Sequence, residues 1–129
     1  MKKHIFNFSV AYADTDASGI MYHGRYLEIA ERARMNWLGK NARPVPDDVG
    51  LVIRNLSIQY IHPLFLADDF SIETNVTAVG AASISFEQKF VKNDKICAIL
   101  SGTVAYLNGV GRPVRMTTVL ADMFANDVK

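Results

Sequence analysis

The chain has 129 residues, of which 50% are hydrophobic and 21% are charged, a composition typical of a soluble globular domain. A chain of this size can bury about two-thirds of the surface that its unfolded form exposes, which is enough for one core. We therefore expect one domain spanning residues 1–129, and the composition excludes a disordered chain.

The charge is nearly balanced: 14 Lys and Arg face 13 Asp and Glu, for a formal net charge of +1. No basic run is present, so we expect no nucleic-acid partner. Cys97 is the single cysteine and cannot form an intrachain disulfide, and Asn7 and Ser9 interrupt any apolar signal core. No segment approaches the roughly 18 apolar residues of a membrane span. These features predict a cytoplasmic protein with no transmembrane segment.

The first half of the chain changes from strand to helix periodicity. Apolar and polar residues alternate over residues 4–12, which predicts a half-buried strand. Residues 13–21 are short and polar and contain a glycine, which predicts a tight loop. Apolar residues then recur at helical spacing over residues 22–38, and Gly39 follows the last of them. This segment is predicted to be the one long helix.

The second half alternates apolar and polar residues in several runs, which predict strands at 56–60, 70–78, 84–90 and 96–107, and a short helix at 119–124. The last three strands are joined by short connections and should form an antiparallel meander. Segregated helices and strands indicate an α+β fold in which one helix covers one sheet face. An uncovered edge strand favours self-association, so we expect a homo-oligomer.

Functional residue types are densest from Asp14 to Tyr26, on the loop that enters the long helix. The start of a helix presents unpaired N–H groups and a partial positive charge, which suit an anion or a developing oxyanion. Gly19 and Gly24 would let a substrate approach the backbone closely. Tyr22 is near enough to the helix start to line a pocket.

The two aspartates of this loop have several possible roles. Residues 14–19 copy the start of a calcium-binding EF-hand loop, but Arg25 stands where the bidentate Glu is required, so we expect no metal. Asp14 is expected to form hydrogen bonds within the loop. For Asp16 the residues alone leave two possibilities, a loop-forming side chain or a catalytic base or nucleophile.

The histidines are scattered without metal-ligand spacing. His23 suits an acid or base, a neutral hydrogen-bond donor, or a residue whose backbone amide is the useful group. His4 and His62 are expected to be structural, and Cys97 is expected to be in the core. Phosphate-binding and dinucleotide-binding glycine motifs and the serine-hydrolase elbow do not occur in the sequence.

The stretch from Val10 to Tyr26, followed by Glu31–Arg34, closely resembles the 4-hydroxybenzoyl-CoA thioesterase family and especially its YbgC-like acyl-CoA thioesterases. Those proteins carry a strand, then D-T-D-A-x-G-x-x-Y-H, a small residue and a Tyr, then E-R-A-R on the helix. A weaker resemblance continues through Ile58–Tyr60, residues 63–69 and Gly111–Arg112. It implies the hotdog fold, an antiparallel β-sheet wrapped around one long central helix, and homodimers or dimer-based homotetramers with active sites at subunit interfaces.

The resemblance also implies roles for individual residues. The catalytic aspartate of the family corresponds to Asp16, and the oxyanion-binding backbone N–H corresponds to that of His23. Some members grip the CoA phosphates with Arg, Lys and Ser before the third main strand, where this chain has Val79–Ser83 and keeps only Ser83. We therefore take Ser83 as a substrate-binding candidate together with Gly19, Tyr22 and Gly24. Other candidates for the phosphates are Arg54, Arg112 and Arg115.

The function implied is hydrolysis of an acyl-CoA, or an acyl-carrier-protein thioester, to a free acid and a thiol. Asp16 would act as nucleophile or general base, with CoA as part of the substrate and no metal or organic cofactor. One alternative is a hotdog hydratase or dehydratase acting on β-hydroxyacyl thioesters, which needs an acid/base pair. Another is a non-catalytic acyl-thioester binding protein, against which a buried or partly buried Asp16 would argue.

Overall fold

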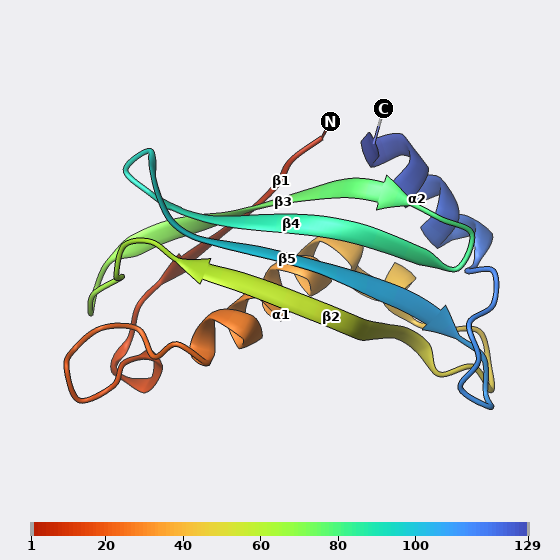
Figure 1. Ribbon diagram of the computed structural model, residues 1–129, viewed down its shortest axis with the longest axis horizontal. Coiled ribbons are helices and arrows are strands. Elements are labelled where there is room, and N and C mark those ends of the chain that lie inside the picture. The colour runs from red at the N-terminus through yellow and green to blue at the C-terminus, as the bar shows by residue number, and fades with distance from the viewer. Residues whose placement is uncertain (1, 129) are drawn as a thin grey trace.

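The computed structural model describes residues 2–128, in which one five-stranded sheet packs against a central helix (Figure 1). The sheet order is β1-β3-β4-β5-β2, and every neighbouring pair is antiparallel. The strands are β1 (His4–Ser9), β2 (Gly50–Tyr60), β3 (Asp69–Val79), β4 (Ser83–Lys92) and β5 (Lys95–Leu107). The helices are α1 (Arg25–Leu38) and α2 (Thr118–Val128), with 3-10 turns η1 (Tyr12–Asp14) and η2 (Gly39–Ala42). The predicted α+β architecture is confirmed.

The core lies between α1 and the face of the sheet that curves over it. Strand side chains alternate between the two faces, so Ile72 and Phe90 are opposite each other in the β3–β4 register and both point inward. Ile29, Ala30 and Ala33 of α1 are also buried, at the helical spacing expected from the sequence. Cys97 is 2% exposed, as expected for a core residue, and burial raises the pKa of its thiol.

One polar network crosses this core. Gln88 of β4 is fully buried and donates to the Ala30 carbonyl of α1 at 2.9 Å and to Thr74 Oγ1 of β3 at 3.1 Å. Arg34 donates to Gln88 Oε1 at 2.9 Å, and its guanidinium lies 4.9 Å from the Phe86 ring centroid. Buried polar groups favour the arrangement that satisfies them, so this network fixes α1 in one position on the sheet.

The ends of the first strand and of the central helix differ from the sequence prediction. β1 ends at Ser9, not at residue 12, because the chain turns into η1, where Asp14 Oδ2 accepts the Ala11 N–H at 2.8 Å. Helix α1 begins at Arg25, not at residue 22, with Gly24 as its N-cap. The Tyr22 N–H is bonded to the Asp14 carbonyl at 2.8 Å, and the Tyr22 carbonyl accepts the Arg25 N–H at 2.9 Å in a turn that precedes the helix.

The C-terminal helix is longer than predicted, since α2 spans Thr118–Val128 and covers one end of the sheet beside β3. A hydrogen bond of 2.9 Å joins His4 Nε2 to Asp127 Oδ2, and the His4 ring stacks on Trp37 at 4.2 Å. His4 therefore ties β1 to α2 and is structural, as expected. Of the helices in residues 2–128, none has the length and apolar character needed to span a bilayer.

Candidate active site

Asp14 is a structural residue of the loop between β1 and α1. Its side chain is 3% exposed, and besides the Ala11 N–H it accepts a bond from Arg25 Nε at 2.7 Å. The Asp14 carboxylate raises the pKa of the Arg25 guanidinium through this hydrogen bond and through its charge. The expectation that Asp14 forms the loop is confirmed, and the ion pair connects the loop to the first residue of α1.

Asp16 lies two residues further on and has the opposite environment. It is exposed, and its Oδ1 accepts the Ser18 N–H at 2.8 Å in an Asx turn. The Asp16 N–H bonds to the Ile20 carbonyl at 3.0 Å, so the loop itself holds this residue. Within residues 2–128 the other carboxylate oxygen, Oδ2, has no hydrogen-bond partner. Asp16 is exposed in the single chain, so the single chain does not show the burial that would argue against a non-catalytic role.

The backbone conformation of Gly19 gives a further reason for glycine at this position. Its φ of +80° lies in the left-handed region, and a side chain there would meet no atom within 4 Å. The turn that holds Asp16 therefore requires glycine for its backbone conformation. At Gly24 a Cβ would lie 2.9 Å from Cε2 of the Tyr22 ring, so a larger residue would displace this exposed ring.

A pocket of about 270 Å³ opens beside Asp16 at the N-terminal end of α1. Asp16 and His23 line it from the loop, Tyr26 from α1, and Tyr60 and His62 from the end of β2 and the residues after it. The structure thus brings the two predicted catalytic positions together. Tyr22 does not line this pocket; its ring lies 4.3 Å from the His23 ring and over Gly24.

The start of α1 supplies the hydrogen-bond donors of the pocket. His23 immediately precedes the N-cap Gly24, so it lies before the first helical turn and not on it as predicted. In the part of the chain that the structure describes, neither the His23 N–H nor the Gly24 N–H has an acceptor. These free donors and the partial positive charge of the helix start favour a negative oxygen in the pocket.

Ser83 is not part of this constellation within one chain. It begins β4 opposite Ala105 of β5, and two residues later Leu107 is opposite Gly50 of β2. The Asp16 pocket is at the other end of β2, beside Tyr60. Residues Arg112 and Arg115 are exposed on the segment between β5 and α2, and Arg54 is exposed on β2.

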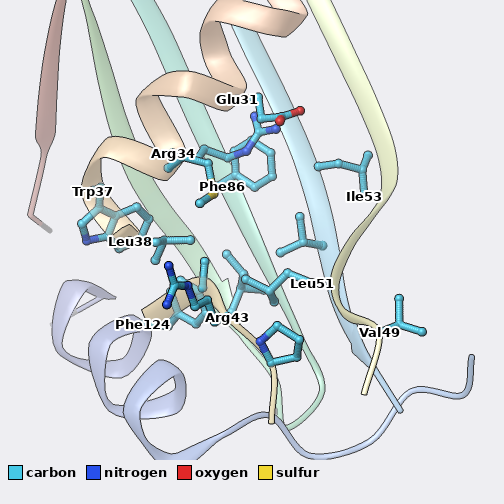
Figure 2. Close-up of a pocket in the computed structure, with 15 residues that line it drawn as sticks. Glu31, Arg34, Trp37, Leu38, Arg43, Val49, Leu51, Ile53, Phe86 and Phe124 are labelled. Carbon is cyan, nitrogen blue, oxygen red and sulfur yellow. The ribbon is translucent and has the colours of Figure 1, made fainter. Parts of the chain in front are cut away.

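A second, apolar pocket of about 450 Å³ lies between the C-terminal half of α1 and the strands β2, β4 and β5 (Figure 2). Trp37 and Leu38 of α1 contribute to one wall, Leu51 of β2 contributes to another, and Phe124 of α2 lies at one end. Neither Asp16 nor any histidine lines this pocket. Its lining suits apolar groups, whereas the reactive groups gather in the smaller pocket.

Residues 10–124 match the thioesterase-like superfamily. The chain belongs to this superfamily. It is 34% identical over 115 residues to the acyl-CoA thioesterase YbgC of Haemophilus influenzae, covering 84% of this chain and 85% of that protein. A solved structure of a 1,4-dihydroxy-2-naphthoyl-CoA thioesterase from Synechocystis is similar with a TM-score of 0.87, 15% identity and 97% coverage of both chains. These similarities confirm the predicted family and hotdog fold.

Two lining residues of this thioesterase-like protein were missed by the sequence analysis. The sequence predicts a structural role for His62 and places Tyr60 in a strand that belongs to the family pattern. Both reach the pocket because β2 pairs with β5 and ends beside the β1–α1 loop, which Met21 joins through an N–H bond of 2.7 Å to the Leu64 carbonyl. The segment around Pro63 and the β1–α1 loop are far apart in the sequence. No local sequence pattern predicts that they lie side by side.

Proposed function

We propose that the protein, an acyl-CoA thioester hydrolase, uses Asp16 as nucleophile or general base and the His23 backbone N–H as oxyanion donor. One observation carries the proposal: Asp16, with a carboxylate oxygen that has no partner among residues 2–128, and His23, with a free backbone N–H, line the same pocket. Gly24, next to His23, adds a second free N–H at the helix start. A thioester carbonyl placed between Asp16 and these N–H groups would meet the reacting group on one side and the hydrogen-bond donors on the other.

Two routes use this arrangement. In the first, Asp16 Oδ2 attacks the carbonyl carbon, the CoA thiolate leaves and takes up a proton, and water hydrolyses the resulting anhydride. In the second, Asp16 accepts a proton from a water molecule that attacks the carbonyl directly, and the tetrahedral intermediate then expels the CoA thiolate, which takes up a proton. In both routes the carbonyl oxygen becomes negative and is stabilised by the N–H groups of the helix start. The groups are those of the chain and of water, and we propose that no metal or organic cofactor takes part.

We also propose that the protein is a homodimer or a dimer-based homotetramer. β2 pairs with β5 on one side only, so its other edge carries free backbone groups within the described part of the chain. Exposed apolar residues accompany that edge, among them Val49, Ile53 and Ile61. An edge of this kind pairs readily with a second copy. Antiparallel pairing of two β2 strands would bring the Ser83 end of one subunit toward the Asp16 pocket of the other.

Light scattering tests the assembly. We expect a particle mass of two or four times the 14.3 kDa of the chain at micromolar concentration. The physical reason is that pairing covers the β2 edge and its apolar side chains, which a single chain leaves in water. A mass of 14.3 kDa at every protein concentration up to about 100 μM would contradict the assembly proposal, because obligate subunit interfaces are formed at such concentrations.

The activity is tested by thiol release from a panel of aliphatic and aromatic acyl-CoAs. We expect wild-type protein to release CoA from at least one member, and the ranking defines the acyl preference. Because Cys97 is buried, a thiol reagent reports released CoA and not the folded protein. Conversion of a β-hydroxyacyl-CoA to its enoyl thioester without thiol release would favour a hydratase or dehydratase instead. Tight binding of acyl-CoA without conversion would favour a binding protein.

Two finer points belong to the same proposal. Failure with every CoA ester but thiol release from acyl-carrier-protein thioesters would identify a carrier-protein substrate, since CoA and the carrier protein carry the same pantetheine arm.

We also propose a cytoplasmic location. It is supported by the single cysteine, Cys97, which is buried and free.

A further inference from the structure

We infer that Tyr60 is a positioning residue for the Gly24 N–H, the free donor next to the proposed oxyanion donor of His23, because its hydroxyl holds the peptide group between His23 and Gly24. The inference rests on the proposed function and adds a residue to it. Tyr60 is the last residue of β2, and its Oη donates a hydrogen bond of 2.6 Å to the His23 carbonyl. The bond joins the end of an edge strand to the start of α1.

The peptide between His23 and Gly24 has few other restraints. The chain before it is held by the Tyr22 N–H bond to the Asp14 carbonyl, and the chain after it by the Arg25 N–H bond to the Tyr22 carbonyl at 2.9 Å. Gly24 has no side chain that would limit rotation. The His23 carbonyl is the remaining group through which this peptide can be held, and the Tyr60 hydroxyl donates a hydrogen bond to it. Loss of this bond would let the plane of this peptide turn and move the free Gly24 N–H. The His23 N–H belongs to the preceding peptide, whose Tyr22 carbonyl accepts the Arg25 N–H.

The bond also changes the electrostatics of the donors. A carbonyl that accepts a hydrogen bond polarises its own peptide group, so the N–H of that peptide becomes a better donor. This N–H belongs to Gly24, and it has no acceptor among residues 2–128. Tyr60 therefore acts on the oxyanion site through the His23 carbonyl and not by contact with the reacting atoms.

The Tyr60 ring is itself held in place by an aromatic contact. It packs edge-on against Tyr26 with ring centroids 5.0 Å apart and an interplanar angle of 85°. Tyr26 is 3% exposed and packs against Phe90 at 5.1 Å, so the contact continues into the core. Burial raises the pKa of the Tyr60 hydroxyl, which keeps the donating proton in place at neutral pH.

The test is Tyr60→Phe, which removes the hydroxyl and keeps the ring. On the best acyl-CoA of the panel we expect kcat to fall about tenfold, while KM changes less than about twofold, because misplaced donors affect the transition state more than substrate binding. Tyr106→Phe is the matched control. Its hydroxyl donates to Asp48 at 2.8 Å and accepts the Val45 N–H at 3.2 Å at the other end of the sheet. This control should lower Tm and leave kcat unchanged.

A second readout does not depend on turnover. In amide NMR spectra of the intact protein, Tyr60→Phe should shift the Gly24 signal, because its peptide loses the hydrogen bond on the carbonyl, whereas Tyr106→Phe should not. A kcat within twofold of wild type, a higher KM at unchanged kcat, or an unshifted Gly24 amide would each overturn the positioning role. Wild-type protein without activity on any thioester would overturn the proposed function itself, and the role of Tyr60 in the reaction with it.

Discussion

Asp16→Asn is expected to reduce kcat on acyl-CoA substrates at least about a thousandfold and to leave Tm unchanged. An amide neither attacks a thioester nor accepts a proton from water at neutral pH, so both proposed routes are lost. The fold should persist because Oδ1 of asparagine can accept the Ser18 N–H as Oδ1 of Asp16 does at 2.8 Å. The measurement is thiol release at saturating substrate, with a thermal melt of the same sample.

Asp122→Asn is the matched control for this variant. Asp122 is exposed on α2, at a distance from the β1–α1 loop, and the change removes the same charge. It should leave kcat at the wild-type value. If Asp16→Asn also kept near wild-type kcat, Asp16 would be removed from the mechanism.

Asp14→Asn is expected to lower the free energy of unfolding by about 2 kcal/mol, the second large effect. The Asp14 carboxylate accepts from Arg25 Nε and from the Ala11 N–H, one on each oxygen. Asparagine offers one acceptor, and its amide N–H₂ would face the other donor. The Arg25 side chain is 30% exposed, so water compensates part of the lost charge pairing. Denaturant unfolding measures the change.

Glu28→Gln is the comparison that shows how much the burial of the Asp14 carboxylate contributes to the free energy of unfolding. Glu28 binds the same guanidinium, through Arg25 Nη1 at 2.9 Å, but its side chain is 66% exposed. Exposed pairs contribute little, so this variant should unfold almost as wild type does. Equal destabilisation by Glu28→Gln and Asp14→Asn would show that the buried position of Asp14 has no special importance.

Periodicity predicted the strands, the long helix and the α+β class, and the family resemblance supplied the hotdog fold. The inward-facing residues of β3 and β4 recur every second position, and those of α1 recur at helical spacing, since each pattern follows from backbone geometry. The assignment of Asp14 to the loop also came from local chemistry. For Asp16 the residues left two roles open, and the family resemblance supplied the catalytic one, which remains a proposal.

Element ends were predicted less well because tertiary hydrogen bonds decide them. The apolar spacing placed Tyr22 in the helix, yet its N–H is bonded to the Asp14 carbonyl, and α1 begins only at Arg25. His23 therefore precedes the helix. Its N–H has no acceptor among residues 2–128, as is also expected on the first helical turn where the sequence placed it.

The composition of the pocket was decided by tertiary structure. Tyr60 and His62 follow Asp16 by more than 40 residues, and they reach it because β2 runs antiparallel to β5 and ends beside the loop. The β4–β5 pairing places Ser83, which the family resemblance makes a substrate-binding candidate, at the far end of the sheet from the Asp16 pocket of the same chain. Local spacing determined that a strand, a loop with two aspartates and a long helix would form. Strand pairing between distant segments decided which side chains meet there.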